Sequence, residues 1–215
     1  MKLVIISPEG FEPREHVVLA GLFASGLERY HVRKPGWNEA EVRRFIRGVP
    51  EQWRSRLVLH QSHELAAELG CGGVHYKDKV GRGTPAELGA NAVRSIVAPC
   101  LLSSRSCHTV AALEAALGHC DSVFFSPVFP SISKRDYGPT DDVAEVSSLL
   151  NRRSVAQRRT TVVALGGIKP ENAMRCGELG FDGVAVLGAL WQAEKPLKVF
   201  DQLQEAISSH AARSP

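Results

Sequence analysis

The chain has 215 residues, 44% of them apolar, which is enough to bury a sizeable core in one large domain or two small ones. Its net charge of +3 is spread thinly, so small anionic ligands are better expected partners than nucleic acid. A short N-terminal apolar run, no bilayer-length segment and five scattered cysteines without a CxxC pair predict a cytoplasmic protein with reduced thiols and no membrane partner.

Eight short β-rich runs alternate with segments of helical periodicity along the chain. The strand candidates are residues 2–7, 30–34, 56–61, 72–77, 95–103, 121–128, 160–167 and 183–188. Most of them are continuous apolar runs, which is typical of parallel strands buried on both faces. Helical spacing between the runs is clearest at residues 63–69, 109–118 and 170–180.

A short pattern recurs before every second strand: a helix end, a glycine, three residues and then the strand. It reads ASGLERYHV, ELGCGGVHY, ALGHCDSVFF and ELGFDGVAV, and its glycine suits a left-handed helix C-terminus. Eight βα units with this repeat predict a (β/α)8 TIM barrel of parallel strands, formed as a single domain by residues 1–215. An open doubly wound sheet is the alternative. Residues 209–215 are expected to fray.

Polar and cationic residues follow most of the predicted strands. In a barrel of this kind the ligand binds at the carboxyl ends of the strands. The residues found there include His31, Arg33, Lys34, His60, Gln61, His75, Lys77, Asp78, Ser106, His108, Ser131, Ser133 and Lys134. Their gathering at one rim predicts a site for an anionic small molecule.

Two glycine-containing loops and one hydroxyl-rich loop are candidate phosphate sites. Gly166 and Gly167 end the seventh predicted strand, and Leu187 and Gly188 end the eighth. Glycine lets backbone N–H groups approach a phosphate closely, and a following helix N-terminus favours its charge. The stretch FFSPVFPSISK adds Ser131, Ser133 and Lys134 on a stiff loop. Tight turns and solvated surface cations are the structural alternatives.

Histidines provide candidate proton carriers. His108 opens a helical segment after a serine-rich strand end, so it is either a proton shuttle or an ordinary helix-start histidine. His60 and His75 do not form a recognisable metal set in the sequence, and no zinc site is predicted.

Four ordered blocks, spread over about residues 2 to 190, resemble the thiamin-phosphate synthase and thiazole tautomerase superfamily. They are YHVRKP, VLHQSHELAAELGCGGVHYKD, SCHTVAALEAALGHCDSVFFSPVFPSISK and VVALGGIKPENAMRCGELGFDGVAVLGAL. The last two blocks are specific in combination, whereas a lone GG would not be.

The resemblance implies a role for each matching position. Lys134, Ser131 and Ser133 match the loop that holds diphosphate in the synthase, Arg33 matches its anion-binding arginine, and Ser106 matches a serine near the diphosphate. The matches for the thiazole phosphate site are Gly166, Gly167, Leu187 and Gly188. His108 matches the histidine that the tautomerase branch uses for proton transfer.

Several positions depart from the synthase pattern. Gln61 and Val80 stand where the family has its magnesium-binding aspartates, which leaves Asp78 as the remaining acidic candidate for Mg²⁺. His31 replaces a glutamine, and Lys34 lies beside the position of a family lysine. The extra cations Lys34, Lys77 and Lys79 could take over the charge of the ion or hold a monophosphate without metal.

These observations predict a thiamine-biosynthesis enzyme that acts on small phosphorylated substrates. The preferred reading is a synthase that joins a hydroxymethylpyrimidine diphosphate to a thiazole phosphate and releases diphosphate. The alternatives are a metal-free tautomerase with His108 as the proton shuttle, and a non-catalytic barrel that binds a phosphorylated ligand. The assembly is left open, with a homodimer among the alternatives.

Overall fold

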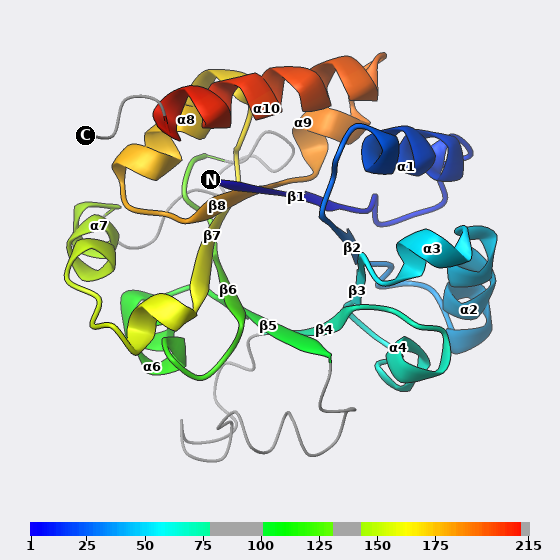
Figure 1. Ribbon diagram of the computed structural model, residues 1–215, viewed down its shortest axis with the longest axis horizontal. Coiled ribbons are helices and arrows are strands. Elements are labelled where there is room, and N and C mark those ends of the chain that lie inside the picture. Colours follow the sequence, from blue (N-terminus) through cyan, green and yellow to red (C-terminus); the bar gives the residue numbers. More distant parts are fainter. Residues whose placement is uncertain (78–100, 131–142, 212–215) are drawn as a thin grey trace.

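Eight parallel strands close into a barrel in the order of the sequence, which confirms the predicted TIM barrel (Figure 1). The computed structural model describes residues 1–77, 101–130 and 143–211. The strands are β1 (Lys2–Ile6), β2 (Arg29–Val32), β3 (Leu57–Leu59), β4 (Gly73–Tyr76), β5 (Leu102–Cys107), β6 (Ser122–Phe125), β7 (Thr161–Leu165) and β8 (Gly183–Val186).

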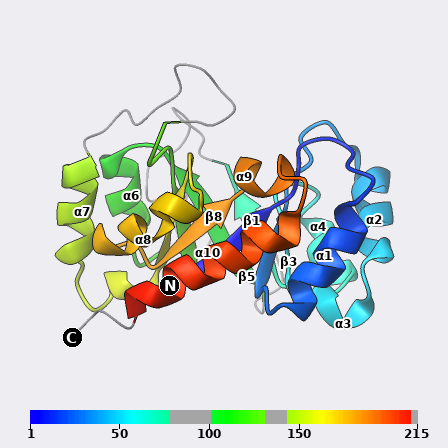
Figure 2. The same ribbon diagram turned by 90° about the horizontal axis from the view of Figure 1, so that it is seen from above.

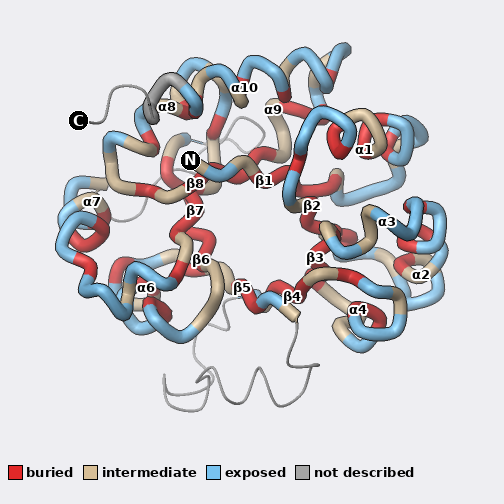
Figure 3. Tube along the Cα trace, viewed as in Figure 1, coloured by how far each residue is buried: buried red, intermediate tan, exposed pale blue. Residues whose placement is uncertain are grey.

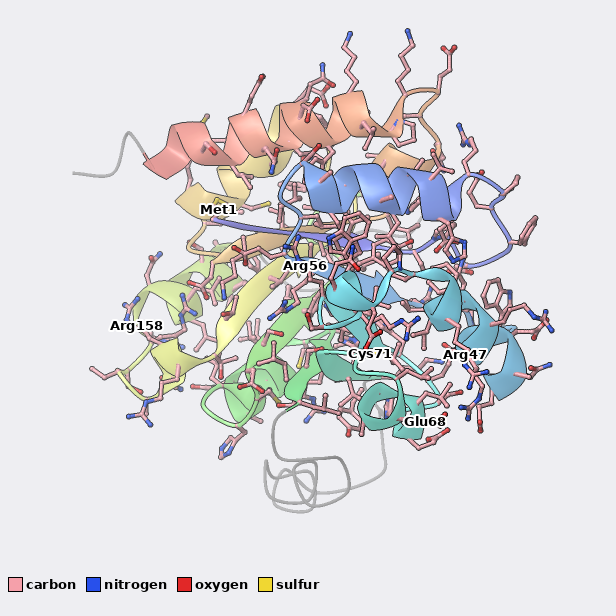
Figure 4. The ribbon with its side chains drawn as sticks, turned by 45° about the vertical axis from the view of Figure 1, so that its right-hand side comes forward. Met1, Arg47, Arg56, Glu68, Cys71 and Arg158 are labelled. Atoms are coloured by element: carbon pink, nitrogen blue, oxygen red, sulfur yellow. The ribbon has the colours of Figure 1, made fainter. Side chains whose placement is uncertain are left out.

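Helices surround the barrel on its outside (Figures 1 and 2). They are α1 (Glu15–Ala24), α2 (Glu39–Gly48), α3 (Glu51–Arg54), α4 (Glu64–Glu68), α6 (Val110–Ala116), α7 (Val143–Asn151), α8 (Pro170–Glu178), α9 (Gly188–Trp191) and α10 (Pro196–Ala211), with a 3-10 turn at Gln157–Arg159. Charged side chains such as Arg47, Glu68 and Arg158 lie at the outer edge of this shell (Figure 4). None of the described helices combines the length and the hydrophobicity that crossing a bilayer requires.

The repeated glycine has the conformation that its position predicts. Gly26, Gly70, Gly118 and Gly180 follow α1, α4, α6 and α8, and all four have positive φ angles between 73° and 93°. A side chain with a Cβ atom is strained in this left-handed region, so glycine ends each helix and turns the chain into the next strand. The repeat in the sequence is therefore a repeat of βα units in the structure.

Most strand residues are buried (Figure 3), and the two faces of the strands meet different surroundings. The outward side chains pack with the helices in the main hydrophobic core; they include Ile5, Tyr30, Val32, Leu57, Leu59, Val74, Val123, Val162 and Val184. The inward side chains of β1, β6, β7 and β8 form a second, smaller apolar cluster, made of Val4, Ile6, Phe124, Val163 and Ala185. This second cluster is the floor on which the site rests.

The predicted end of the fifth strand is wrong. The apolar run at residues 95–103 was expected to be the strand, whereas β5 spans Leu102–Cys107 and reads LSSRSC. Residues 95–100 lie outside the described part of the chain. Inside the barrel, Ser104 and Ser106 hydrogen-bond to the ring of His75. Hydroxyl groups with buried partners can line a barrel interior, and a search for apolar runs misses such a strand. Ser106 therefore lies in a strand and not in the loop after it.

The C-terminal helix α10 continues to Ala211 and packs beside α8 (Figure 2). The predicted frayed segment, 209–215, lies mostly outside the described residues, which end at Ala211.

Candidate active site

A cavity of about 410 Å³ opens at the carboxyl ends of the strands. All eight strands, or the residues that directly follow them, contribute to its wall. The lining residues are Ile6, Glu9, Arg33, His60, His75, Lys77, Ser106, His108, Phe124, Ser126, Leu165, Gly166, Gly167, Ile168, Ala185, Val186, Leu187, Gly188 and Ala189. This volume lies within the usual range of pockets that bind small molecules and cofactors.

The loop after β7 is built from glycine for steric reasons. Gly166 and Gly167 have φ angles of +98° and +65°. A Cβ atom on Gly166 would lie 2.9 Å from Cα of Pro127, and one on Gly167 would lie 2.4 Å from the carbonyl oxygen of Pro130. The loop after β6 is pressed against these glycines, and the backbone N–H of Phe129 donates to the carbonyl of Gly166 over 3.2 Å. The two loops therefore support each other at the rim of the cavity.

The loop after β8 brings backbone donors to the same rim. Leu187 precedes α9, and Gly188 and Ala189 form its first turn. The N–H groups of a first helical turn have no acceptor within the helix, so they are available to a ligand. A Cβ atom on Gly188 would meet nothing closer than 3.7 Å, so this glycine leaves open space at the cavity wall.

Charged groups line the opposite side of the cavity. Arg33, directly after β2, pairs with Glu9, and both residues line the wall together with Lys77. The side chain of Arg33 is one-third exposed, so an anionic ligand can compete with Glu9 for its guanidinium.

His108 lines the cavity, and one of its ring nitrogens has no hydrogen-bond partner among the residues that the structure describes. Its Nδ1 lies 2.8 Å from the carbonyl oxygen of Ser126. A carbonyl only accepts hydrogen bonds, so Nδ1 carries the proton and Nε2 keeps its lone pair. His108 is thereby held in one tautomer, with Nε2 as the nitrogen that can take up a proton.

Lys34 does not reach the cavity, and its predicted role in phosphate binding needs correction. Its side chain is fully buried, and Nζ lies 2.5 Å from Glu15 and 2.8 Å from the carbonyl oxygen of Gly10. The ammonium group also lies 4.7 Å from the ring centre of Trp37, and Tyr30 donates to Glu15 over 2.7 Å. Burial lowers the pKa of Lys34 and raises that of Glu15, while the ion pair between them opposes both shifts. This cluster ties α1 to the loop after β2.

Three buried histidines meet beneath the charged side of the cavity. His31 lies in β2, His60 directly follows β3, and His75 lies in β4. Nδ1 of His31 is 3.0 Å from Nε2 of His60, and the rings of His60 and His75 stack with their centres 4.0 Å apart. His60 and His75 line the cavity, whereas His31, which was predicted to contact the substrate, lies behind them.

Burial keeps these three imidazoles neutral. It lowers the pKa of His31 to about 3 and those of His60 and His75 well below the ordinary value. Repulsion from the other rings of the cluster and from the positive charge of Arg33 lowers the pKa values of His60 and His75 further. At neutral pH each ring therefore offers one nitrogen with a lone pair.

The structure brings together most of the described candidates. Arg33, Ser106, His108, Gly166, Gly167, Leu187 and Gly188 all line the cavity. The predictions for Ser131, Ser133, Lys134, Asp78 and Val80 lie outside the described residues. Glu9 and Ser126 were missed. Ser126 directly follows β6 and Glu9 lies three residues after β1, so inspecting those two strand ends would have found them.

The described residues of the cavity do not fit Mg²⁺, which prefers several oxygen ligands, carboxylates above all. Glu9 is the one carboxylate in the described lining, and it pairs with Arg33. Gln61 accepts from the backbone N–H of Lys34 over 3.3 Å and donates to the carbonyl oxygen of Lys34, so its amide is already engaged.

Comparisons with known proteins agree on one family. A family model described as thiamine monophosphate synthase matches residues 3–190. A thiamine-phosphate synthase of Laribacter hongkongensis is 27% identical, and the match covers 97% of this chain and 95% of the relative. One of Methylobacillus flagellatus is 31% identical, with 86% and 84% covered.

Solved structures give the same result. A thiamine phosphate pyrophosphorylase of Bacteroides thetaiotaomicron is 25% identical, with a TM-score of 0.71 and both chains covered completely. A thiamine phosphate pyrophosphorylase of Pyrococcus furiosus, at 19% identity, has the same fold with a TM-score of 0.77, and the match covers 97% of this chain and 96% of that one.

Proposed function

Because the chain belongs to the thiamine monophosphate synthase family, we propose that it is a transferase of thiamine biosynthesis. In the proposed reaction, a hydroxymethylpyrimidine diphosphate and a thiazole phosphate are joined, and diphosphate is released. The observation that carries this proposal is the cavity itself. It combines glycine loops after β7 and β8, a cationic side and an apolar floor, which are the surroundings that two phosphorylated heterocycles require.

The glycine side is the proposed site of the thiazole phosphate. Gly167 and Gly188 lie on neighbouring loops, because β7 and β8 pair directly. Backbone N–H groups and the first turn of α9 supply neutral donors to a phosphate, and the absence of side chains lets the anion come close. In a TIM barrel, the loops after strands 7 and 8 are a frequent phosphate site.

The cationic side is the proposed site of the diphosphate. During the reaction the bond between the pyrimidine methylene carbon and the diphosphate oxygen breaks, and its electron pair leaves with the diphosphate. The lone pair of the thiazole nitrogen forms the new C–N bond. Arg33 and Lys77 stabilise the negative charge that develops on the leaving group. The apolar walls at Ile6, Phe124 and Leu165 limit the access of water to the electron-poor carbon.

A tautomerase is the second candidate, and the orientation of His108 favours it. The hydrogen bond to Ser126 leaves Nε2 of His108 free in the cavity. A base in this place can remove a proton from a bound thiazole precursor and return it to another atom, which converts an exocyclic double bond into an aromatic ring. This reaction needs one phosphate site and one proton carrier, and no metal.

One pair of assays separates the two candidates. Diphosphate release is measured with both synthase substrates, with and without Mg²⁺, and proton exchange with solvent deuterium is measured on the thiazole substrate alone. The synthase proposal expects diphosphate release that falls by about 100-fold in Arg33→Ala, the size of an electrostatic transition-state contact. Arg152→Ala, at an exposed position far from the cavity lining, is the matched control. Proton exchange without diphosphate release, lost in His108→Asn, would make the protein a tautomerase.

A further inference from the structure

The three-histidine cluster, defined as His31, His60 and His75, is assigned no role by the proposed reaction. Its members come from the neighbouring strands β2, β3 and β4 (Figure 1), and each is less than a tenth exposed. One ring nitrogen from each residue lies within 4.8 Å of the other two. Buried imidazole rings need hydrogen-bond or metal partners. An apolar barrel interior could be filled by aliphatic side chains without any such partner, so three histidines at one place call for an explanation.

The spacing of the nitrogens is close to that of a metal site. Four-coordinate Zn²⁺ has bonds to histidine nitrogen of about 2.0–2.1 Å, which places ligand atoms roughly 3.3 Å apart. Nδ1 of His31 and Nε2 of His60 are already 3.0 Å apart. The rings of His60 and His75 are stacked, with an interplanar angle of 17°, so the ring of His60 must rotate about its side-chain bonds before both residues aim at one ion. Rotations of this kind leave the backbone of the barrel unchanged.

Hydrogen bonds around His75 hold its ring in a ligand-competent tautomer. Ser104 donates its hydroxyl proton to the carbonyl oxygen of Val74 over 3.2 Å, so the same hydroxyl must accept from Nδ1 of His75. Nδ1 therefore carries the proton, and the lone pair lies on Nε2, where it accepts from the hydroxyl of Ser106 over 2.9 Å until an ion takes its place. A second hydrogen-bond partner that fixes the ring in this way is typical of metal-binding histidines.

The ligand atoms of the three-histidine cluster favour a transition-metal ion over Mg²⁺. Imidazole nitrogen suits Zn²⁺, Co²⁺ and Ni²⁺, whereas Mg²⁺ prefers oxygen ligands. The ring of Phe124 packs against those of His31 and His75, with ring centres 4.7 Å and 5.0 Å away, and covers this side of the cluster with an apolar surface. His60 and His75 face the cavity, so a fourth ligand can enter from there.

From this geometry we propose that His31, His60 and His75 form a binding site for one divalent transition-metal ion of the Zn²⁺ and Co²⁺ class, with an open position toward the cavity. Three protein ligands and one exchangeable position are the arrangement of a catalytic metal centre. The test of this site is independent of the proposed reaction, because metal binding is measured on the protein without any substrate.

The test uses the full chain, stripped with a chelator and then titrated with CoCl₂ while visible absorption is recorded. We expect one Co²⁺ per chain, with the d–d bands of a four-coordinate nitrogen site. Thiolate ligands from cysteine would instead give a strong near-ultraviolet band. His60→Asn, which removes one ligand at the edge of the cavity, is expected to weaken binding by at least about 100-fold.

His119→Asn is the matched control, because His119 is exposed and lies outside the cavity lining. It is expected to bind Co²⁺ as the wild type does. X-ray absorption of the wild-type Co²⁺ complex counts imidazole ligands without a variant, so the test stands even if His60→Asn does not fold. Three imidazoles support the proposal. No binding, fewer than three imidazoles, thiolate bands, or equal affinity in His60→Asn and the wild type would overturn it.

Discussion

The two halves of the barrel interior differ in chemistry. Strands β1, β6, β7 and β8 point apolar side chains inward, among them Val4, Phe124 and Ala185. Strands β2, β4 and β5 point imidazole and hydroxyl groups inward, as His31, His75 and Ser104 do, and His60 follows β3 on the same side. The apolar half offers a ligand the backbone of its loops, whereas the polar half offers side chains.

This difference predicts which changes each half tolerates. In the apolar half, ligand binding depends on the path of the loop backbone. Adding a Cβ atom to one of the loop glycines should therefore disturb stability and binding more than removing a charged side chain would. In the polar half, function depends on buried groups with few alternative partners, so removing one partner leaves the other unsatisfied. The predictions below test this contrast, beginning with the largest expected effect.

Lys34→Met has the largest expected effect, and it tests the same rule for buried polar groups at the outer side of the barrel, directly after β2. The substitution leaves Glu15 buried without its cation, and the expected loss of unfolding free energy is about 3–5 kcal/mol. Urea denaturation measures it. Arg43→Met is the control, because its pairs with Glu39 and Glu68 lie at the surface and should contribute little to stability. Equal losses in the two variants would show that the buried cluster is not what ties α1 to the loop after β2.

The matching test of the apolar half is Gly167→Ala. Its Cβ atom would lie 2.4 Å from the carbonyl of Pro130, and alanine is strained at a φ of +65°. We expect a loss of about 2–4 kcal/mol in stability, together with loss of phosphate binding. Gly188→Ala has room for its Cβ, and its stability should change by less than about 1 kcal/mol. Thermal and chemical denaturation of both variants decide whether backbone conformation limits this half.

Acid should weaken the polar half selectively. Below about pH 6.5 the unfolded chain binds a proton at His31, whereas the folded chain does not until the pH approaches the lowered pKa of about 3. Stability is therefore complete above pH 6.5 and falls as the pH drops, by about 2 kcal/mol at pH 5 from His31 alone. The lowered pKa values of His60 and His75 act in the same direction.

The measurement is urea denaturation from pH 7.5 to 5 with a chelator present. His31→Leu should reduce the dependence on pH, and His119→Leu, at an exposed position, should leave it unchanged. A slope that is identical in all three proteins would mean that the buried histidines take up protons in the folded state.

The smallest expected effect is on substrate affinity. Arg33→Lys keeps the positive charge but loses the two-pronged geometry of a guanidinium, so KM for the diphosphate substrate should rise about tenfold. Arg152→Lys, which is exposed and not part of the cavity lining, should not change KM. An unchanged KM in Arg33→Lys would place the diphosphate away from the cationic side.

The sequence predicted the apolar half better than the polar half. Gly118 and Gly180 marked the βα repeat before β6 and β8, and Gly166 and Gly188 marked the loops at the rim, because backbone requirements leave a local trace in the sequence. The histidine cluster left no local trace in the sequence. His31 and His60 come together because β2 pairs with β3, and this pairing links residues that lie far apart along the chain. A residue's distance along the chain does not reveal its neighbour across a barrel.

Two further errors have the same origin. Lys34 was expected at the cavity because it follows a strand, but its partner Glu15 comes from α1, on the outer side of the barrel. The fifth strand was misplaced because Ser104 and Ser106 find partners on His75, which apolar periodicity does not record. In each case a long-range polar contact decided the position of the side chain.

The central claim is that the mouth of this barrel holds a phosphorylated heterocycle between backbone donors on one side and cations on the other. A crystal structure with thiazole phosphate tests it most directly. The account predicts the phosphate within hydrogen-bonding distance of backbone N–H groups in the loops at Gly167 and Gly188, with the ring directed toward Arg33. A phosphate bound outside this cavity, or held on the Arg33 side with the glycine loops empty, would contradict it.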